Sequence, residues 1–264
     1  MPKGRSSEGK ESTADLHRFF SNKGEFAEYL LLSFLRNATE PVGSWVLKAM
    51  LDAKGVQVGT ATIGRILKDS DNRGLTELVG LQGRIITDKG HTYINDLSKR
   101  LERERLQEKL MSAAKPQNLD QLLDLLRVRK ALECESACLA AIRAEPVHIK
   151  MLESSMQKHE ERLSRGEDPT ETAFEFHRII AVAAQNSFLM ATLDVLYFEE
   201  IRLESRVANL IKKSKAPEYA PEHAHIYEAI VRQDPEEASR RMRLHMDSLI
   251  QSIEAQDLTN NRNG

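Results

Sequence analysis

The second half of the chain reads as one helix after another, and this succession constrains the fold more than any other feature. Between residues 118 and 256 apolar side chains recur at three- and four-residue spacing, and Pro, Ser, Asn or Asp opens each segment. Helices of this length form a bundle whose interior can hold a cavity. We predict six of them, over residues 119–144, 146–165, 169–185, 187–213, 221–232 and 235–256.

Three of the predicted helices carry a histidine on the side that the spacing marks as buried. His177, His223 and His245 each lie three or four residues from apolar side chains of their own helix. Rings from three separate helices could converge on one point, and the alanines around His177 would leave space there for a small ligand. On the residues alone two readings stay open: a metal site, or three ordinary core histidines.

The first 90 residues show a different pattern. Apolar spacing predicts one helix from Glu25, a second with Ser44 as its N-cap, and a third opening at Gly59. Two short apolar stretches, residues 75–79 and 84–87, flank a glycine-bounded turn and predict a β-hairpin. Three helices followed by a hairpin are the plan of a winged helix-turn-helix.

The linking segments complete the predicted organisation. Residues 91–111 read as one charged helix whose apolar stripe is too short for a coiled coil, and Pro116 marks a boundary after it. The predicted fold class is mainly α, a winged helix-turn-helix followed by an all-α bundle of six to seven helices. The predicted segments are a polar tail (1–22), a winged-helix domain (23–90), a connector (91–117), a helical domain (118–256) and a second tail (257–264).

Composition bears on location and partners. No apolar run approaches the length of a membrane span or of a signal-peptide core, so we expect a cytoplasmic protein. Cys134 and Cys138 lie four residues apart on a predicted helix, which favours small core residues over a disulfide. Residues 1–114 carry 18 Lys and Arg against 15 Asp and Glu, whereas residues 115–264 carry 20 against 25. The front half is therefore the part suited to nucleic acid.

The winged-helix segment resembles a known family. The sequence from Glu40 to Gly90, through Pro41-Val42-Gly43-Ser44, GLTE and GRIITDKG, is similar to the winged helix of the archaeal regulator NrpR and of ribonuclease R. In such domains the third helix enters the major groove and the hairpin lies over the adjacent backbone. The resemblance implies base contacts by Thr60, Thr62 and Arg65, and phosphate or minor-groove contacts by Lys68, Gln82 and Arg84. A wing that binds protein is the alternative.

The helical segment resembles a second family. LLRVRKALECESACLAA, FHRIIAVAAQN, EHAHIYEAI and RRMRLHMDSL are similar, in this order, to the landmarks of the FCD domain, the effector-binding domain of FadR-type regulators in the GntR superfamily. Many members hold a divalent metal with an Asp, a His four residues later, and two further His. Those His positions fall on His177, His223 and His245, whereas the Asp position is Ala173.

The departure at Ala173 bears on the metal that the resemblance implies. A carboxylate there would supply a hard oxygen ligand and a charge to offset a dication. Three neutral imidazoles still make an open site for zinc or nickel, but they are poor ligands for magnesium, calcium or manganese.

Two more positions follow from the same resemblance. Arg129 matches an arginine that points into the cavity in many members and can bind an effector carboxylate, although an ion pair with Glu133 is the alternative. Asn186 matches the family's Asn at a helix break, and we expect it to cap the helix that opens at Ser187.

The function predicted from these features is a ligand-responsive, DNA-binding transcription regulator. We expect a homodimer on double-stranded DNA, a small organic acid as effector, and repression as the commoner sign of control. FCD domains generally follow a GntR-type winged helix, whereas this front half is of another type. The alternatives are an RNA-binding regulator and a metal-dependent enzyme. An enzyme is not expected, because no carboxylate is recognised as a general base on the inward faces of the His-bearing helices.

Overall fold

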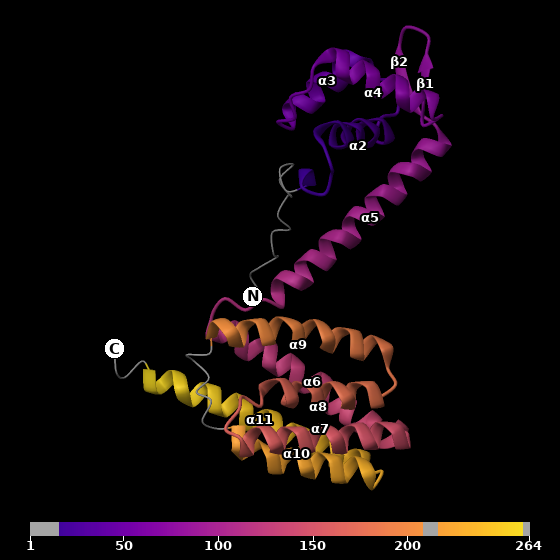
Figure 1. Cartoon of the computed structure of the whole chain (residues 1–264). Helices are drawn as coiled ribbons and strands as arrows, with labels where there is room; N and C mark the ends of the chain where they lie inside the picture. Colours follow the sequence, from indigo (N-terminus) through magenta and orange to yellow (C-terminus); the bar gives the residue numbers. More distant parts are fainter. Residues whose placement is uncertain (1–15, 208–215, 261–264) are drawn as a thin grey trace, which may run out of the picture. The chain divides into compact units, whose positions relative to one another are not determined.

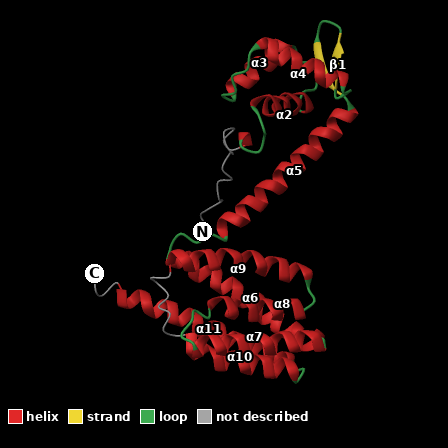
Figure 2. Ribbon diagram, in the orientation of Figure 1, coloured by secondary structure: helices red, strands yellow, loops and turns green. Residues whose placement is uncertain are grey.

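The computed structural model describes residues 16–207 and 216–260 (Figure 1). The chain divides into two compact units, Met1–Lys109 and Leu110–Gly264, and each is described by itself. Figure 2 shows that helices make up nearly all of both units and that the only strands of the described part form one hairpin. No helix within the described ranges is both long and apolar enough to cross a membrane.

The first unit is a winged helix. Its elements are α2 (Lys23–Arg36), α3 (Ser44–Ala53), α4 (Thr60–Asn72), β1 (Thr76–Val79) and β2 (Gly83–Ile86), and α5 (Asp88–Ala113) follows them. The two strands pair antiparallel, with Thr76 opposite Ile86 and Val79 opposite Gly83. This is the predicted order of three helices and a hairpin.

The core of this unit comes from the apolar faces of α2, α3 and α4. Phe20 and Leu16 pack against it, although both lie in the stretch predicted as a tail. Its buried members are Phe26, Ala27, Leu30, Leu31, Leu35, Leu47, Leu51, Val56, Val58, Ile63 and Leu67. The three-residue spacing that predicted these helices therefore also selects the side chains that hold them together.

The hairpin is fastened to the turn before α3. Val42 and Arg84 exchange two backbone hydrogen bonds, of 2.9 and 3.0 Å. Gly83 has φ +128°, and a Cβ there would lie 2.3 Å from the carbonyl carbon of Val42. Only glycine fits this close approach. The expected N-cap at Ser44 was wrong, because Gly43 precedes the helix without a side-chain cap and Ser44 is its first residue.

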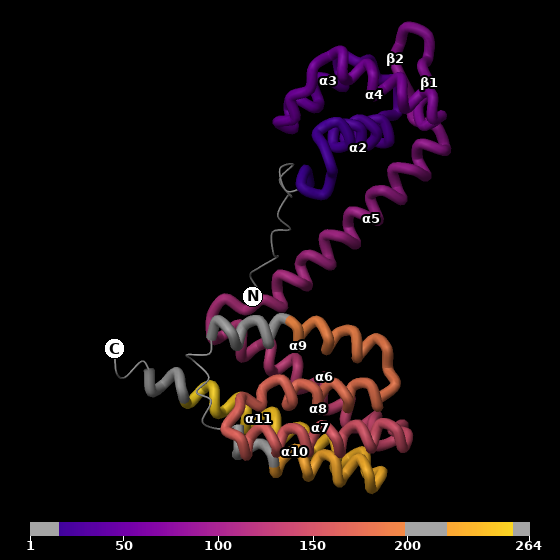
Figure 3. The backbone as a smooth tube through the Cα atoms, in the orientation of Figure 1, coloured from indigo at the N-terminus to yellow at the C-terminus, as the bar shows by residue number. Residues whose placement is uncertain are grey.

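The second unit is a bundle of six described helices, whose course Figure 3 traces. They are α6 (Leu119–Arg143), α7 (Pro146–Ser164), α8 (Thr170–Ala183), α9 (Ser187–Val207), α10 (Ala216–Val231) and α11 (Pro235–Asn260). α6 packs along α11 and also against α8, while α10 lies against α11 and α7. Small and apolar side chains from α6, α8, α10 and α11 form its main core.

Local signals explain where the bundle helices begin. The side chain of Asn118 accepts a hydrogen bond from the backbone of Gln121 and caps α6. Pro146 occupies the first turn of α7, where its missing N–H costs nothing. Asp234 accepts from the backbone N–H of Glu237 at the start of α11.

Two predicted boundaries were wrong. α10 begins at Ala216 rather than at 221, so that Pro221 lies inside the helix. α11 continues to Asn260, past the predicted end at 256. The part of α9 predicted over residues 208–213 lies outside the described residues.

Candidate metal centre and nucleic-acid interface

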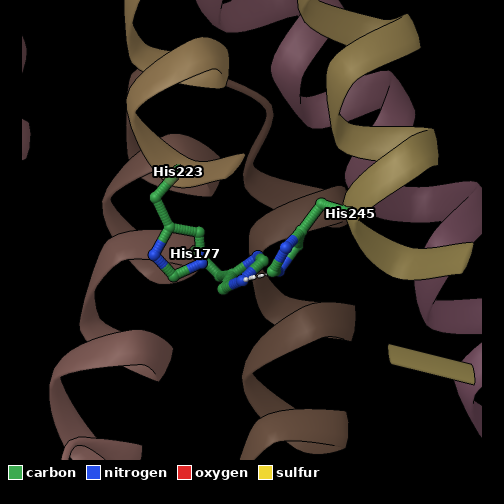
Figure 4. Close-up of side chains that lie close together, drawn as sticks. All are labelled: His177, His223 and His245. Atoms are coloured by element: carbon green, nitrogen blue, oxygen red, sulfur yellow. Dashed lines mark hydrogen bonds between the residues drawn. The ribbon is translucent and has the colours of Figure 1, made fainter. Parts of the chain in front are cut away.

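His177, His223 and His245 meet inside the bundle. They come from α8, α10 and α11, and all three side chains are buried. Each offers one ring nitrogen, and these three nitrogens lie within 4.8 Å of one another. Figure 4 shows the three rings turned toward a common point. The ring centroids lie 5.3 Å apart for His177 and His223, 5.0 Å for His177 and His245, and 4.7 Å for His223 and His245.

A buried carboxylate orients the first ring. Nδ1 of His177 lies 2.6 Å from Oε2 of Glu133, a residue of α6 that is 1% exposed. The other oxygen of Glu133 accepts hydrogen bonds from Nε of Arg129 at 2.6 Å and from the hydroxyl of Tyr197 at 2.9 Å. Burial by itself raises the pKa of Glu133, but the charge of Arg129 and the contact with His177 hold that pKa far below its usual range.

The ionised state of Glu133 decides which nitrogen of His177 carries the proton. A carboxylate only accepts hydrogen bonds, so Nδ1 is the protonated atom and Nε2 presents its lone pair to the cluster. Burial lowers the pKa of His177 to about 4, which keeps the ring neutral at pH 7.

A second carboxylate orients the third ring in the same way. Nδ1 of His245 lies 2.8 Å from Oε2 of Glu222, on α10. The hydroxyl of Ser248 donates to the other oxygen of Glu222 at 2.8 Å. Nε2 of His245 is thereby turned inward, as Nε2 of His177 is.

These two inward nitrogens lie 3.1 Å apart. The dashed line in Figure 4 marks this contact, which is at hydrogen-bond distance. With the ring protons on the two Nδ1 atoms, both Nε2 atoms would present lone pairs to the same point. A cation between them would satisfy both. Two nitrogens that ligate one zinc ion from about 2.0–2.1 Å at neighbouring positions are themselves about 3 Å apart, so the spacing suits a shared ion.

His223 completes the set of donors. Its Nε2 is buried and has no hydrogen-bond partner among the described residues. Burial lowers the pKa of His223 well below its usual value, and the face of the ring stacks on Phe176 with centroids 4.4 Å apart. A buried nitrogen without a partner is costly unless a ligand occupies the site. The three residues could therefore hold a divalent ion through nitrogen while leaving further positions open.

Sequence reasoning missed the carboxylates of this centre. No carboxylate was expected on the inward faces of the His-bearing helices, yet Glu222 of α10 contacts His245. Glu133, on α6, was considered only as a partner of Arg129, and it also contacts His177. The available signals were a glutamate four residues after Arg129 on an apolar face, and a glutamate directly before His223. Neither signal names a partner, because both contacts join residues of different helices.

The two residues assigned to the effector lie in defined structural contacts. Arg129 is buried, pairs with Glu133 and lies against the rings of Phe174 and Tyr197. This is the alternative that was left open for Arg129. The side chain of Asn186 accepts a hydrogen bond from the backbone of Leu189 and so caps α9, as expected. Contact of either residue with an effector stays a prediction.

The residues assigned to DNA fall into two groups. Thr60, Arg65 and Lys68 are exposed on α4, where Arg65 donates a hydrogen bond to the half-buried Thr62. Gln82 is exposed in the turn of the hairpin.

Arg84 is differently placed. Its guanidinium makes a two-pronged contact with Asp71 at 3.0 and 2.8 Å and is 15% exposed. This pair ties β2 to the end of α4, and a phosphate contact by Arg84 would require that it open.

Both halves of the chain match known domain families. Residues 124–248 match the FCD domain, and residues 29–94 match the ribonuclease R winged-helix domain. The HTH-type transcriptional regulator LutR of Bacillus subtilis (strain 168) is 26% identical over 200 residues, which cover 75% of this chain and 85% of that protein.

Solved structures of similar proteins span most of the chain. A GntR protein of Streptococcus agalactiae is 22% identical, with a TM-score of 0.43, and the match covers 87% of this chain and 99% of that one. McbR/YncC of E. coli is 13% identical, with a TM-score of 0.48, and the match covers 94% and 99%.

The domain matches confirm both resemblances seen in the sequence, including the joining of an FCD domain to a winged helix of the ribonuclease R type. The relatives are transcription regulators and not enzymes. The chain is a DNA-binding transcription regulator in which a winged helix precedes an FCD domain, and it is similar to regulators of the GntR superfamily.

Proposed function

We propose that this regulator is a homodimeric repressor whose helical domain holds a divalent metal and responds to a small organic acid. His177, His223 and His245 would bind the metal, and zinc or nickel is the expected ion because all three donors are neutral imidazoles. The observation that carries the proposal is the 3.1 Å spacing of two Nε2 atoms whose opposite nitrogens both face carboxylates.

The surrounding charges support this proposal. A dication bound by three neutral ligands needs negative charge nearby, and Ala173 supplies none. Oε2 of Glu133 and Oε2 of Glu222 lie 2.6 and 2.8 Å from Nδ1 of two of the ligands and can offset the charge of the ion from there. Glu133 also faces the cation of Arg129, which offsets part of its charge, whereas Glu222 accepts a hydrogen bond from the neutral hydroxyl of Ser248.

The bound metal would supply Lewis-acid positions for the oxygen atoms of an acid. Residues of the protein hold the three ligands in place. Glu133 faces Nδ1 of His177, Glu222 faces Nδ1 of His245, and Phe176 stacks on the ring of His223. These contacts connect four helices, α6, α8, α10 and α11. A ligand that changes the spacing of these helices is therefore placed to alter the whole bundle.

Control of DNA binding then follows from linkage. Two winged helices of a dimer would bind two half-sites of an operator. An effector that prefers a bundle geometry unsuited to this spacing lowers operator affinity, and DNA lowers effector affinity by the same factor.

Metal analysis of the purified protein tests the proposal. We expect about one zinc or nickel ion per chain, and its loss in His177→Ala, His223→Ala and His245→Ala. His225→Ala is the matched control, because His225 is exposed on the same helix as His223. A wild-type protein that takes up neither ion would overturn the metal centre. A loaded protein whose DNA affinity responds to no small carboxylic acid would overturn the effector class alone.

A further inference from the structure

A fourth buried histidine lies beside the cluster of His177, His223 and His245 and is not one of its three donors. His159, on α7, is 5% exposed. Its ring meets that of His223 edge to face, with centroids 5.5 Å apart. Its Nδ1 lies 3.0 Å from the hydroxyl oxygen of Thr172, and that hydroxyl donates its proton to the backbone oxygen of Pro169 at 2.7 Å.

This chain of contacts decides the tautomer of His159. Because the only hydroxyl proton of Thr172 goes to Pro169, Thr172 can only accept from the ring. Nδ1 of His159 therefore carries the proton, and Nε2 presents a lone pair. Nε2 is buried and has no hydrogen-bond partner among the described residues. His159 thus repeats the pattern of His177: Nδ1 faces an oxygen acceptor, and Nε2 is left to bind something else.

His159 is held by a residue next to Ala173, the position at which the related domains carry an aspartate. Thr172, which holds the ring, is the neighbour of Ala173 at the start of α8. Ala173 lies one turn before His177, where the family has its aspartate ligand. The turn of α8 that lacks a ligand of its own therefore positions an imidazole from α7.

We propose that His159 supplies a fourth nitrogen to the metal centre, in place of the carboxylate that is absent at Ala173. This inference rests on the proposed metal function. The donor atoms of the other three histidines lie within 4.8 Å of one another, and His159 lies outside that set. It joins them by a shift of its ring when the ion binds. Two imidazoles at tetrahedral positions of one ion have centroids about 5.2 Å apart, so the 5.5 Å between His159 and His223 has to shorten by only a few tenths of an ångström.

A pocket provides the room for this shift. It has a volume of about 180 Å³ and is lined by both His159 and His223, together with Glu153, Met156, Gln157, Glu160 and Ala224. The two glutamates at this pocket favour the approach of a cation over that of an anion. The pocket therefore suits the entry path of the metal ion, with His159 and His223 in its lining.

Metal binding by His159→Ala and His159→Gln tests the proposal. We expect either variant to bind zinc or nickel 10- to 100-fold more weakly in a chelator competition. We also expect a changed visible absorption spectrum with cobalt, since that spectrum reports the number and kind of ligands. His148→Ala and His225→Ala, on α7 and α10, are the controls and should bind as the wild type does.

A rescue variant separates ligation from a structural role. If His159 replaces the family's aspartate, adding Ala173→Asp to His159→Ala should restore most of the lost affinity. Thermal unfolding of the metal-free variants checks that they fold. The fourth ligand is overturned if both His159 variants bind metal with wild-type affinity and show an unchanged cobalt spectrum. The three-histidine metal centre is still supported in that case, provided that His177→Ala loses metal binding. Absence of metal from the wild type would overturn both.

Discussion

Glu133 and His177 are joined by a contact of 2.6 Å between two helices, and this contact connects the ion pair of Arg129 to the histidine cluster. The carboxylate lies between a guanidinium and an imidazole, with the hydroxyl of Tyr197 as a third donor. Its charge therefore has two roles: it neutralises a buried cation, and it fixes the tautomer of a candidate ligand.

Glu133→Gln should impair both roles. Without the charge, the buried Arg129 loses its ion pair with Glu133, and breaking a buried pair costs about 3–5 kcal/mol of unfolding free energy. Metal affinity should also fall, by roughly 10- to 100-fold. Urea unfolding and chelator competition measure the two effects. Glu135→Gln, at an exposed site of the same helix, should change neither. If Glu133→Gln were as stable toward urea as the wild type, the conclusion that Glu133 is ionised and offsets Arg129 would be wrong.

The stability of the metal-free protein should fall as the pH is lowered below about 6.5. Burial lowers the pKa of His177 from 6.5 to about 4 and that of His223 well below 6.5. Above pH 6.5 both rings are neutral in the folded and the unfolded chain. Between 6.5 and 4 the unfolded chain takes up protons that the folded chain refuses, at a cost of up to about 1.4 kcal/mol per pH unit for each histidine.

Urea unfolding at pH 7.5, 6.5 and 5.5, after removal of metal, measures this dependence. Glu133, Arg129 and His245 face His177, and their charges are part of the observed slope. His223→Gln should flatten the profile, whereas His225→Ala should leave it unchanged. A stability that stays level or rises between pH 6.5 and 5.5 would show that the rings take up protons in the folded state.

Gly64→Ala should strengthen α4 and weaken DNA binding. Gly64 lies inside the helix and is exposed, and a Cβ there would meet no atom within 4 Å. Alanine should therefore add about 0.5–1 kcal/mol to the stability of the winged helix. The same methyl group would stand between the helix and the floor of a DNA groove.

DNA selected from a random duplex pool supplies the probe for this variant. Its affinity for wild-type protein and for Gly64→Ala can be compared by anisotropy, with Lys99→Ala on the exposed side of α5 as a control. Unchanged affinity in a stabilised Gly64→Ala protein would place the groove-facing surface elsewhere on α4.

Asp71→Asn distinguishes an anchoring role of Arg84 from a phosphate contact. Hydrogen bonds from Arg84 and Thr76 outweigh burial and lower the pKa of Asp71, so the pair is ionised at neutral pH. If Arg84 anchors the hairpin, Asp71→Asn and Arg84→Ala should each cost about 1–2 kcal/mol and both should weaken DNA binding.

A phosphate contact predicts the opposite behaviour of Asp71→Asn. Release of Arg84 from its partner would then leave DNA affinity unchanged or raise it, while Arg84→Ala alone would lower it. Asp52→Asn, at an exposed pair with Lys48, is the control for loss of a surface charge.

The distribution of elements could be predicted because it depends on neighbours in the sequence. Spacing placed the three helices and the hairpin of the winged helix. The errors lay at helix ends. The prediction placed Pro221 in a first turn, where proline needs no N–H partner. α10 instead begins at Ala216 and holds Pro221 in its second turn, where one backbone hydrogen bond is given up.

The candidate metal site likewise divides into residues that the sequence predicts and contacts that only the packing of helices decides. His177, His223 and His245 were found from the sequence because each lies on the apolar side of its own helix, a property of residues three and four apart. The contacts of Glu133 and Glu222 with the histidines, and the place of His159 beside them, were not found, because they join α6, α10 and α7 to other helices. Periodicity within one helix determines which side chains point inward. Only the packing of helices against one another decides which of them meet, which nitrogen carries a proton, and where the charge beside a metal ion comes from.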